Sequence, residues 1–303
     1  PWLRQDWINR AYMAREENQP QPTTFRHGEE FLHANHDQDN WFLHLETFDP
    51  HEPYFSPERF QDLYRDYLQD RHWDWPPYRQ VQETVEDVRH MRAMSAALHT
   101  MCDFYLGRVL DLMDQYNLWE NTLLIVNTDH GFLLGEHDWW AKCCQPFYNE
   151  VAHTPLFIWD PRSGVQGERR QSLVQTIDLP ATLLEYFGVE RPPDMQGVPL
   201  RATVAEDRPV REAGLYGLFG AHVNCTDGRY TYMRANATPD NKPLYEYTLM
   251  PTHMRSFFDV GDFRDLQVAP PFPFTKGAST MKINCGTWRC RDHAFDELLD
   301  GHR

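Results

Sequence analysis

The amino-acid sequence predicts an α/β fold, a mixed sheet flanked by helices with a smaller C-terminal α+β subdomain. Strand-like and helix-like segments alternate along the first part of the chain, which is typical of a sheet with crossover helices. Beyond about Ala205 the pattern changes, and Asp227-Gly228 between two alternating runs over Val223 to Met233 predicts a hairpin. We therefore expect an α/β core over residues 1–205 and the subdomain over 206–303.

Three short apolar runs, each closed by polar or proline residues, are expected to be buried strands. They are Trp41–Phe48, Leu123–Val126 and Pro155–Trp159.

Three further segments have helical patterns. Pro57–Leu68 predicts a short helix, and apolar residues at three- and four-residue steps predict a long one over Val85–Tyr116, closed near Asn117. Asp178 is expected to open a helix that Gly188 ends.

Composition narrows the possible partners. The 303 residues carry 29 basic and 45 acidic side chains, a net charge of −16, which disfavours nucleic acid and anionic membrane surfaces. No run approaches the roughly 18 apolar residues of a membrane helix. Six cysteines are too few for a disulfide scaffold, so we expect a reducing, cytoplasmic location. The chain starts at Pro1 without an initiator Met, so the missing signal peptide says nothing about export.

Polar residues that carry chemistry follow two of the expected strands, where α/β sheets bind ligands. Asp129 and His130 offer an oxygen and a nitrogen donor side by side, with Gly131 allowing a sharp turn, which suits two ligands of a divalent cation. His51 can accept a hydrogen bond or deliver a proton, and Lys142 can hold an anionic oxygen. Taken singly, each is more commonly a turn, loop or surface residue, and their joint order favours a site.

The same motifs resemble the second half of a sulfatase, a family of the alkaline phosphatase-like superfamily. The resemblance covers roughly Trp41 to Leu200, through these motifs: Asp49-Pro50-His51-Glu52-Pro53-Tyr54, Thr128-Asp129-His130-Gly131, Gly135-Glu136-His137, Lys142, Tyr148-Asn149-Glu150, Thr154-Pro155-Leu156 and Ile177-Asp178-Leu179-Pro180.

The resemblance implies hydrolysis of a sulfate ester, with a small-molecule or glycan leaving group. Asp129 and His130 would be metal ligands, and His51 and Lys142 would hold the ester as catalytic and substrate-binding residues. The cation would be calcium, with manganese or another metal open because His130 is a nitrogen donor. We expect all four side chains to meet in one cleft, on a sheet that contains the strands ending at Phe48 and Asn127.

One part of the family pattern is missing. Sulfatases make a formylglycine nucleophile from Cys or Ser in a Cys/Ser-x-Pro-x-Arg motif, and this sequence contains none. The family's N-terminal pair of Asp ligands is also missing, so we expect the isolated chain to be an inactive fragment. Two alternatives remain: a phosphonate or phosphate monoester hydrolase of the same superfamily, and a catalytically dead module that binds sulfated glycans.

Weaker patterns are expected to be structural. Cys144-Gln145-Pro146 begins like the nucleophile motif but lacks its Arg. His33 and His36 have metal-ligand spacing without a third ligand, and Cys285, Cys290 and His293 resemble a zinc knuckle with too few ligands.

Overall fold

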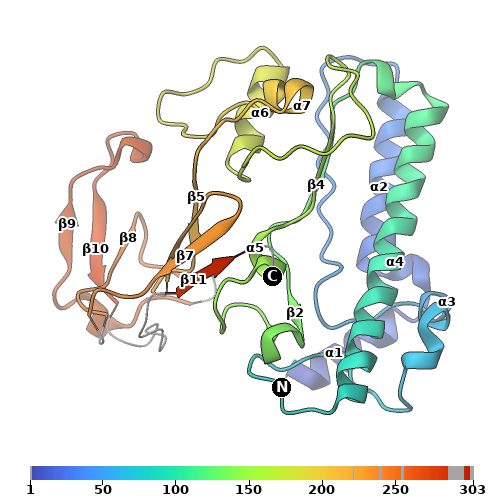
Figure 1. Cartoon of the computed structure of the whole chain (residues 1–303), viewed down its shortest axis with the longest axis horizontal. Helices are drawn as coiled ribbons and strands as arrows, with labels where there is room; N and C mark the ends of the chain where they lie inside the picture. The colour runs from blue at the N-terminus through green and yellow to red at the C-terminus, as the bar shows by residue number, and fades with distance from the viewer. Residues whose placement is uncertain (1, 221, 239–240, 254–255, 286–296, 301–303) are drawn as a thin grey trace. The chain divides into compact units, whose positions relative to one another are not determined.

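The computed structural model describes residues 2–220, 222–238, 241–253, 256–285 and 297–300 (Figure 1). The chain forms two compact units, and each is described by itself. The first consists of Pro1–Ile125 and Phe132–Gln145, and the second of Val126–Gly131 and Pro146–Arg303. The predicted domain boundary at residue 205 stays a prediction. In the described part of the chain, no helix is both long enough and apolar enough to cross a membrane.

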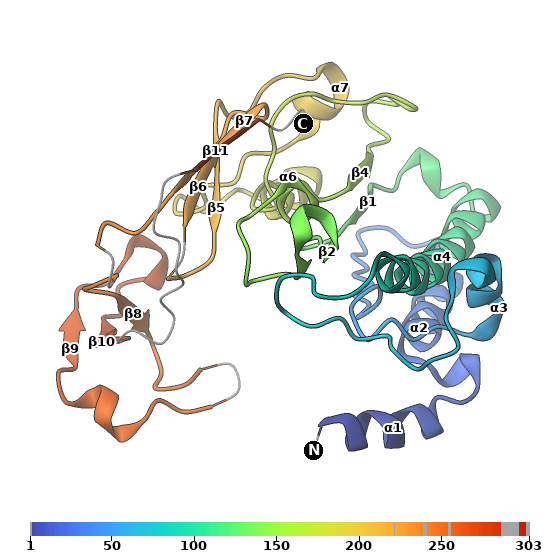
Figure 2. The ribbon, with the colours of Figure 1, turned by 60° about the horizontal axis from the view of Figure 1, so that its bottom comes forward.

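Helices build most of the first unit, and α2 and α4 pack side by side with α3 against α4 (Figure 2). The α-helices are α1 (Trp2–Tyr12), α2 (Pro20–Asn35), α3 (Glu58–Gln61) and α4 (Val85–Gln115). Short 3₁₀ segments are η1 (Glu16–Asn18), η2 (Asp62–Tyr67), η3 (Leu118–Glu120) and η4 (Glu136–Asp138).

The predicted long helix is confirmed as α4, which carries the core of this unit. Its apolar face includes Met91, Leu98 and Met101, all fully buried. Thr84 and Asp87 close its N-terminus with a capping box, and Asn117, in the left-handed conformation, follows its end. The short helix predicted over 57–68 is present as α3, but it tightens into the 3₁₀ segment η2 after one turn.

The strand predicted over Trp41–Phe48 is wrong. This segment is extended and its side chains alternate between partly buried and exposed, but it belongs to no sheet of the described residues. Trp41, Leu43 and Leu45 pack on the core formed with α2 and α4. The apolar residues of this segment therefore pack on helices. A β-strand would in addition need backbone hydrogen bonds to a neighbouring strand.

A small hairpin completes the first unit. Strands β2 (Leu133–Leu134) and β3 (Trp140–Ala141) pair antiparallel, and the fully buried Trp140 donates its indole N–H to Glu83 Oε2 at 2.7 Å. Lys142 directly follows β3, so the hairpin, held by the buried Trp140, fixes the position of the Lys142 backbone.

The second and third predicted strands are confirmed as β1 (Leu124–Asn127) and β4 (Leu156–Trp159). The two strands are neighbours in a two-stranded sheet. Their side chains are mostly partly buried rather than fully buried as expected. The second unit contains β4 and the short helices α5 (Asn149–Ala152), α6 (Asp178–Tyr186) and α7 (Arg201–Glu206). Asp178 opens α6 as predicted, and its buried carboxylate accepts backbone N–H groups of Gln175 and Val198 at 2.8 and 2.9 Å.

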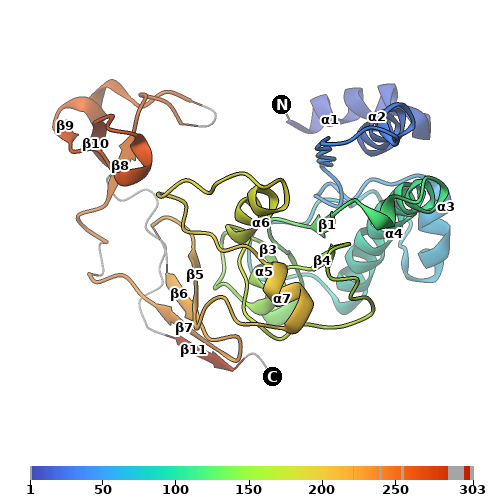
Figure 3. The same ribbon diagram turned by 90° about the horizontal axis from the view of Figure 1, so that it is seen from above.

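Two antiparallel sheets form the later part of the second unit (Figure 3). The predicted hairpin is confirmed, since β6 and β7 pair with Thr226 opposite Thr231 around Asp227-Gly228. One sheet has the order β11-β7-β6-β5 and the other β8-β10-β9. Their strands are β5 (Gly214–Gly217), β6 (Val223–Thr226), β7 (Tyr230–Arg234), β8 (Tyr245–Thr248), β9 (Gln267–Ala269), β10 (Thr280–Asn284) and β11 (Glu297–Asp300), with η5 (Val260–Phe263) and η6 (Pro273–Thr275) between them.

Candidate active site

His51 and Lys142 are brought together in the first unit, although 91 positions separate them in the sequence. His51 lies in the loop that follows the extended segment, and its Nε2 atom is 2.8 Å from Lys142 Nζ. Its Nδ1 atom is 2.5 Å from the backbone oxygen of Glu52. An ammonium group only donates and a carbonyl oxygen only accepts, so Nδ1 carries the proton and Nε2 accepts.

Lys142 is a buried cation in an aromatic setting. Only 8 % of the residue is exposed, and its Nζ lies 5.9 Å from the centroid of the Phe132 ring. A buried ammonium is costly unless groups around it compensate the charge. Such an arrangement is suited to an anionic oxygen, because the charge is held in place before a ligand arrives.

Two residues that the sequence analysis did not select lie beside this pair. Glu52 is 2 % exposed, and its Oε2 atom is 3.2 Å from His51 Nδ1 and 3.9 Å from Lys142 Nζ. Tyr78 donates its hydroxyl to Glu52 Oε1, and burial together with this bond raises the pKa of Tyr78. Glu52 could have been selected from the sequence because it directly follows His51. No local sequence pattern indicates that Tyr78 contacts Glu52.

Asp129 and His130 form a second pair of groups, located in the second unit directly after β1. Asp129 Oδ2 lies 3.4 Å from His130 Nε2, and Asp129 Oδ1 accepts the backbone N–H of His130 at 2.9 Å. His130 Nδ1 is 2.9 Å from the Gly131 carbonyl, so Nδ1 is the donor and Nε2 bears the lone pair. Carbonyl bonds of this kind orient metal-binding histidines.

Gly131 is required at its position by close packing. Its N–H donates to the Val151 carbonyl at 2.8 Å, and a Cβ atom on it would lie 1.8 Å from the Glu150 backbone oxygen. A residue with a side chain would therefore displace the turn that presents Asp129 and His130.

The donor set of this turn fits part of a divalent-cation site. Two donor atoms 3.4 Å apart can share an ion at the usual ligand distances of about 2.0–2.6 Å. Among the described residues, this turn included, no group of three or more His, Cys, Asp or Glu side chains is arranged to hold a metal. The turn therefore offers two neighbouring donor atoms, and the role of Asp129 and His130 as metal ligands stays a prediction. The cleft in which this pair meets His51 and Lys142 stays a prediction.

The weaker patterns have structural partners. His33 and His36 lie at the end of α2. His33 Nδ1 is 2.7 Å from the Tyr116 hydroxyl, and the His36 ring stacks on Tyr116 at 3.8 Å. Cys144 Sγ is 3.2 Å from Gln145 Oε1, in keeping with a packing role. Cys290 and His293 lie outside the described residues.

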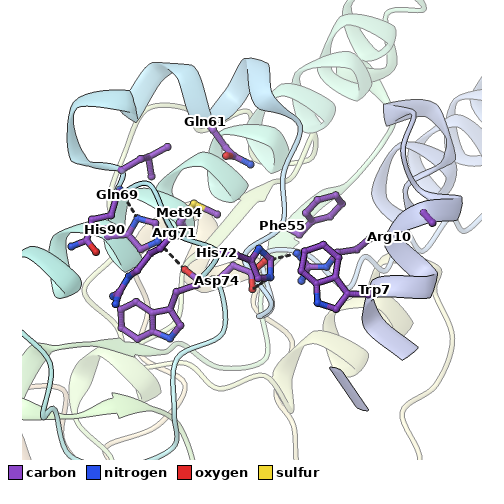
Figure 4. Close-up of a pocket in the computed structure, with 13 residues that line it drawn as sticks. Trp7, Arg10, Phe55, Gln61, Gln69, Arg71, His72, Asp74, His90 and Met94 are labelled. Atoms are coloured by element: carbon purple, nitrogen blue, oxygen red, sulfur yellow. Dashed lines mark hydrogen bonds and ion pairs between the residues drawn. The ribbon is translucent and has the colours of Figure 1, made fainter. Parts of the chain in front are cut away.

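A separate cavity of about 500 Å³ lies in the first unit, and none of the four predicted site residues lines it (Figure 4). Its walls include Trp7, Phe55 and Arg10. Arg10 Nη1 pairs with Asp74 Oδ2 at 2.6 Å and Arg10 Nε with Asp6 Oδ2 at 2.8 Å, so acidic groups already balance its charge. The other arginine of the lining, Arg71, pairs with Asp87 Oδ1 at 2.7 Å, so both guanidinium charges have acidic partners.

Solved structures of known proteins share this fold. One of them is the phosphonate monoester hydrolase of Agrobacterium radiobacter, with a TM-score of 0.58 and 19% sequence identity. The match covers 72% of this chain and 53% of that one. At this identity the likeness shows the fold alone, and it agrees with the predicted fold class.

The family follows from the sequence comparison. A family model described as Sulfatase matches residues 3–189, more than half of the chain, so the chain belongs to the sulfatase family. A second model, described as N-sulphoglucosamine sulphohydrolase, C-terminal, matches residues 135–269.

Curated relatives agree with this family. An arylsulfatase of Clostridium perfringens is 24% identical over 217 residues, 66% of this chain and 45% of the relative. A multifunctional alkaline phosphatase superfamily protein of Trinickia caryophylli, PehA, is 35% identical over 125 residues, 41% of this chain and 24% of the relative. The chain thus spans less than half of the length of these relatives.

Proposed function

We propose that this protein is a sulfatase that hydrolyses a sulfate ester of a small molecule or glycan, with a bound divalent cation. The observation that carries the proposal is the contact of 2.8 Å between His51 Nε2 and the buried Lys142 Nζ. A sulfate monoester requires charge neutralisation of its oxygens and protonation of the departing alkoxide. A buried ammonium touching an imidazole supplies both functions at one place.

His51 and Lys142 would act on the leaving-group side of the ester. Lys142 holds the anionic oxygens through its positive charge. As the bond from sulfur to the ester oxygen breaks, the electron pair stays on that oxygen, which takes a proton from His51 Nε2. His51 must therefore be an imidazolium when the bond breaks and a neutral imidazole afterwards.

Asp129 and His130 would hold the cation, which we propose to be calcium, with manganese as the alternative. When bound, the cation neutralises charge on the non-bridging oxygens of the ester. The family's formylglycine nucleophile would have to come from residues outside this sequence, because no Cys/Ser-x-Pro-x-Arg motif is present.

The test uses His51→Ala in the enzyme with its formylglycine in place, assayed on esters of increasing leaving-group pKa. We expect kcat/KM to fall about 10²–10³-fold for alkyl sulfates, which need the proton, and less than about tenfold for activated aryl sulfates. Lys142→Ala should weaken the hold on all of them, whereas the exposed His27→Ala on α2 is the matched control. An equal loss for every ester would show that His51 does not protonate the leaving group.

A phosphonate or phosphate monoester hydrolase is the second candidate, and the 35% identity to the multifunctional protein PehA favours keeping it. Tetrahedral anions of sulfur and phosphorus require similar charge placement. Measuring kcat/KM for matched sulfate, phosphate and phosphonate esters separates the two. Tight binding of a sulfated glycan without turnover of any ester would instead indicate a binding module.

A further inference from the structure

We propose that Glu52 is a positioning residue for the His51–Lys142 pair, and that Tyr78 holds it in place. The inference rests on the proposed function, because it assigns a role within the same site. Neither residue has a role in the mechanism proposed above. Glu52 nevertheless lies beside His51 and Lys142, and Tyr78 is hydrogen-bonded to Glu52.

The carboxylate of Glu52 is divided between two tasks. Its Oε1 atom accepts the hydroxyl of Tyr78, while Oε2 lies 3.2 Å from His51 Nδ1 and 3.9 Å from Lys142 Nζ. With 2 % of the residue exposed, little water is available to replace these partners. The buried carboxylate therefore lies within 4 Å of both proposed catalytic groups.

Charge explains why a carboxylate is needed there. For His51 to deliver a proton it must become an imidazolium 2.8 Å from the Lys142 ammonium, and the two positive charges repel. The negative charge of Glu52 lies within 4 Å of both groups and offsets that repulsion. Without it, either the imidazole stays neutral or the ammonium is displaced.

Orientation is the second contribution. The Glu52 carbonyl and carboxylate both face His51 Nδ1, at 2.5 and 3.2 Å, which turns Nε2 toward Lys142 and the expected ester. A carboxylate behind a histidine serves the same purpose in catalytic triads.

Tyr78 completes the arrangement. A phenol with the ordinary pKa of 10.0 is already a hydrogen-bond donor at neutral pH, and partial burial together with the bond to Glu52 raises the pKa of Tyr78 further. Charged forms of Cys143 and Cys144 also act on Tyr78, and these thiols are the further titratable groups beside the cluster. The chain of contacts thus runs from Tyr78 through Glu52 to His51 and Lys142.

The first experiment measures His51 by nitrogen-15 NMR in the protein and in Glu52→Gln, which keeps the shape and removes the charge. We expect the nitrogen-15 shifts of His51 to change in Glu52→Gln, because the negative charge 3.2 Å from Nδ1 is removed. Glu29→Gln is the control and should leave these shifts unchanged, because Glu29 is also a buried carboxylate but pairs with Arg108. His51 shifts that are unchanged in a folded Glu52→Gln protein would overturn the proposal.

The second experiment measures kinetics of the enzyme with its formylglycine in place. Glu52→Gln should lower kcat for alkyl sulfates about 10–100-fold and for activated aryl sulfates less than about threefold, with KM little changed. Tyr78→Phe should give a smaller loss with the same dependence on the leaving group, and it replaces Glu52→Gln if that variant does not fold. If kcat instead falls equally for all esters and in step with the thermal stability of the variants, Glu52 is only a structural residue.

The two proposals fail in different ways. If the wild-type enzyme turns over no sulfate ester, the proposed function is wrong, and the NMR comparison still tests the coupling of Glu52 to His51. If wild type and His51→Ala behave as expected but Glu52→Gln equals wild type, the inference alone is wrong.

Discussion

At the residue scale, Asp49 shows what burial does to a carboxylate two positions before His51. Burial raises its pKa from an ordinary 3.8 to about 6, because the charged form loses its water. The neighbouring thiol of Cys102 responds to the same surroundings, and burial raises its pKa to about 12. The Asp49 carboxyl group therefore titrates near pH 6 instead of near pH 4.

The sign of the effect on stability follows from linkage. Since the folded protein binds the Asp49 proton more tightly than the unfolded chain, the stabilisation is complete below about pH 4 and is lost as pH rises through about 6. Asp49→Asn should remove this dependence and stabilise the protein at pH 7.5 by about 1–3 kcal/mol. Urea unfolding at pH 4.5 and 7.5 measures it, with the exposed Asp39→Asn as control. Equal pH slopes for Asp49→Asn and wild type would contradict the raised pKa.

At the scale of elements, α4 is held by local signals and by packing at once. Thr84 Oγ1 accepts the N–H of Asp87 at 3.2 Å, and Asp87 Oδ2 accepts the N–H of Thr84 at 3.0 Å. Asp87 Oδ1 also receives bonds from Gln69 and Arg71 at 3.1 and 2.7 Å, which ties the start of the helix to the preceding loop.

Thr84→Ala should lower the free energy of unfolding by about 1 kcal/mol, because it leaves the N–H of Asp87 without its capping acceptor. Chemical denaturation measures the change, provided that the two proteins show the same dependence of unfolding free energy on denaturant concentration. Thr122→Ala is the control, since this hydroxyl lies outside the helix and bonds to the adjacent Asn121 side chain. A loss as large in the control as in Thr84→Ala would show that the cap adds nothing.

At the scale of the whole molecule, the paired groups are distributed over two compact units. His51 and Lys142 belong to the first, and Asp129 and His130 to the second. A calcium site usually takes 6–8 oxygens, and the described chain offers two adjacent donors. The proposed chemistry therefore needs groups beyond those that the described residues arrange.

The isolated 303-residue chain should accordingly show no sulfatase turnover, since it lacks the formylglycine motif and most of a metal shell. Hydrolysis of an aryl sulfate by the purified chain, with added calcium or manganese, is the measurement. Turnover above a blank preparation that falls in Lys142→Ala would contradict this expectation, because it would show a working site within the chain.

The sequence by itself determined the features that depend on short-range patterns. The period of apolar residues marked α4, turn chemistry marked the hairpin at Asp227-Gly228, and the order of motifs marked the sulfatase family. Each of these signals lies within a few residues or in a fixed order along the chain, so no three-dimensional knowledge was needed.

Only the tertiary structure decided which distant groups touch. The contact of His51 with Lys142 joins positions 91 apart, and Tyr78 reaches Glu52 across 26 positions. The segment over 41–48 packs on helices and pairs with no strand of the described part of the chain, although its apolar pattern suits either environment. Hydrogen bonds and charge compensation act through space, and a linear pattern records the side chains that can take part but not the partners that folding supplies.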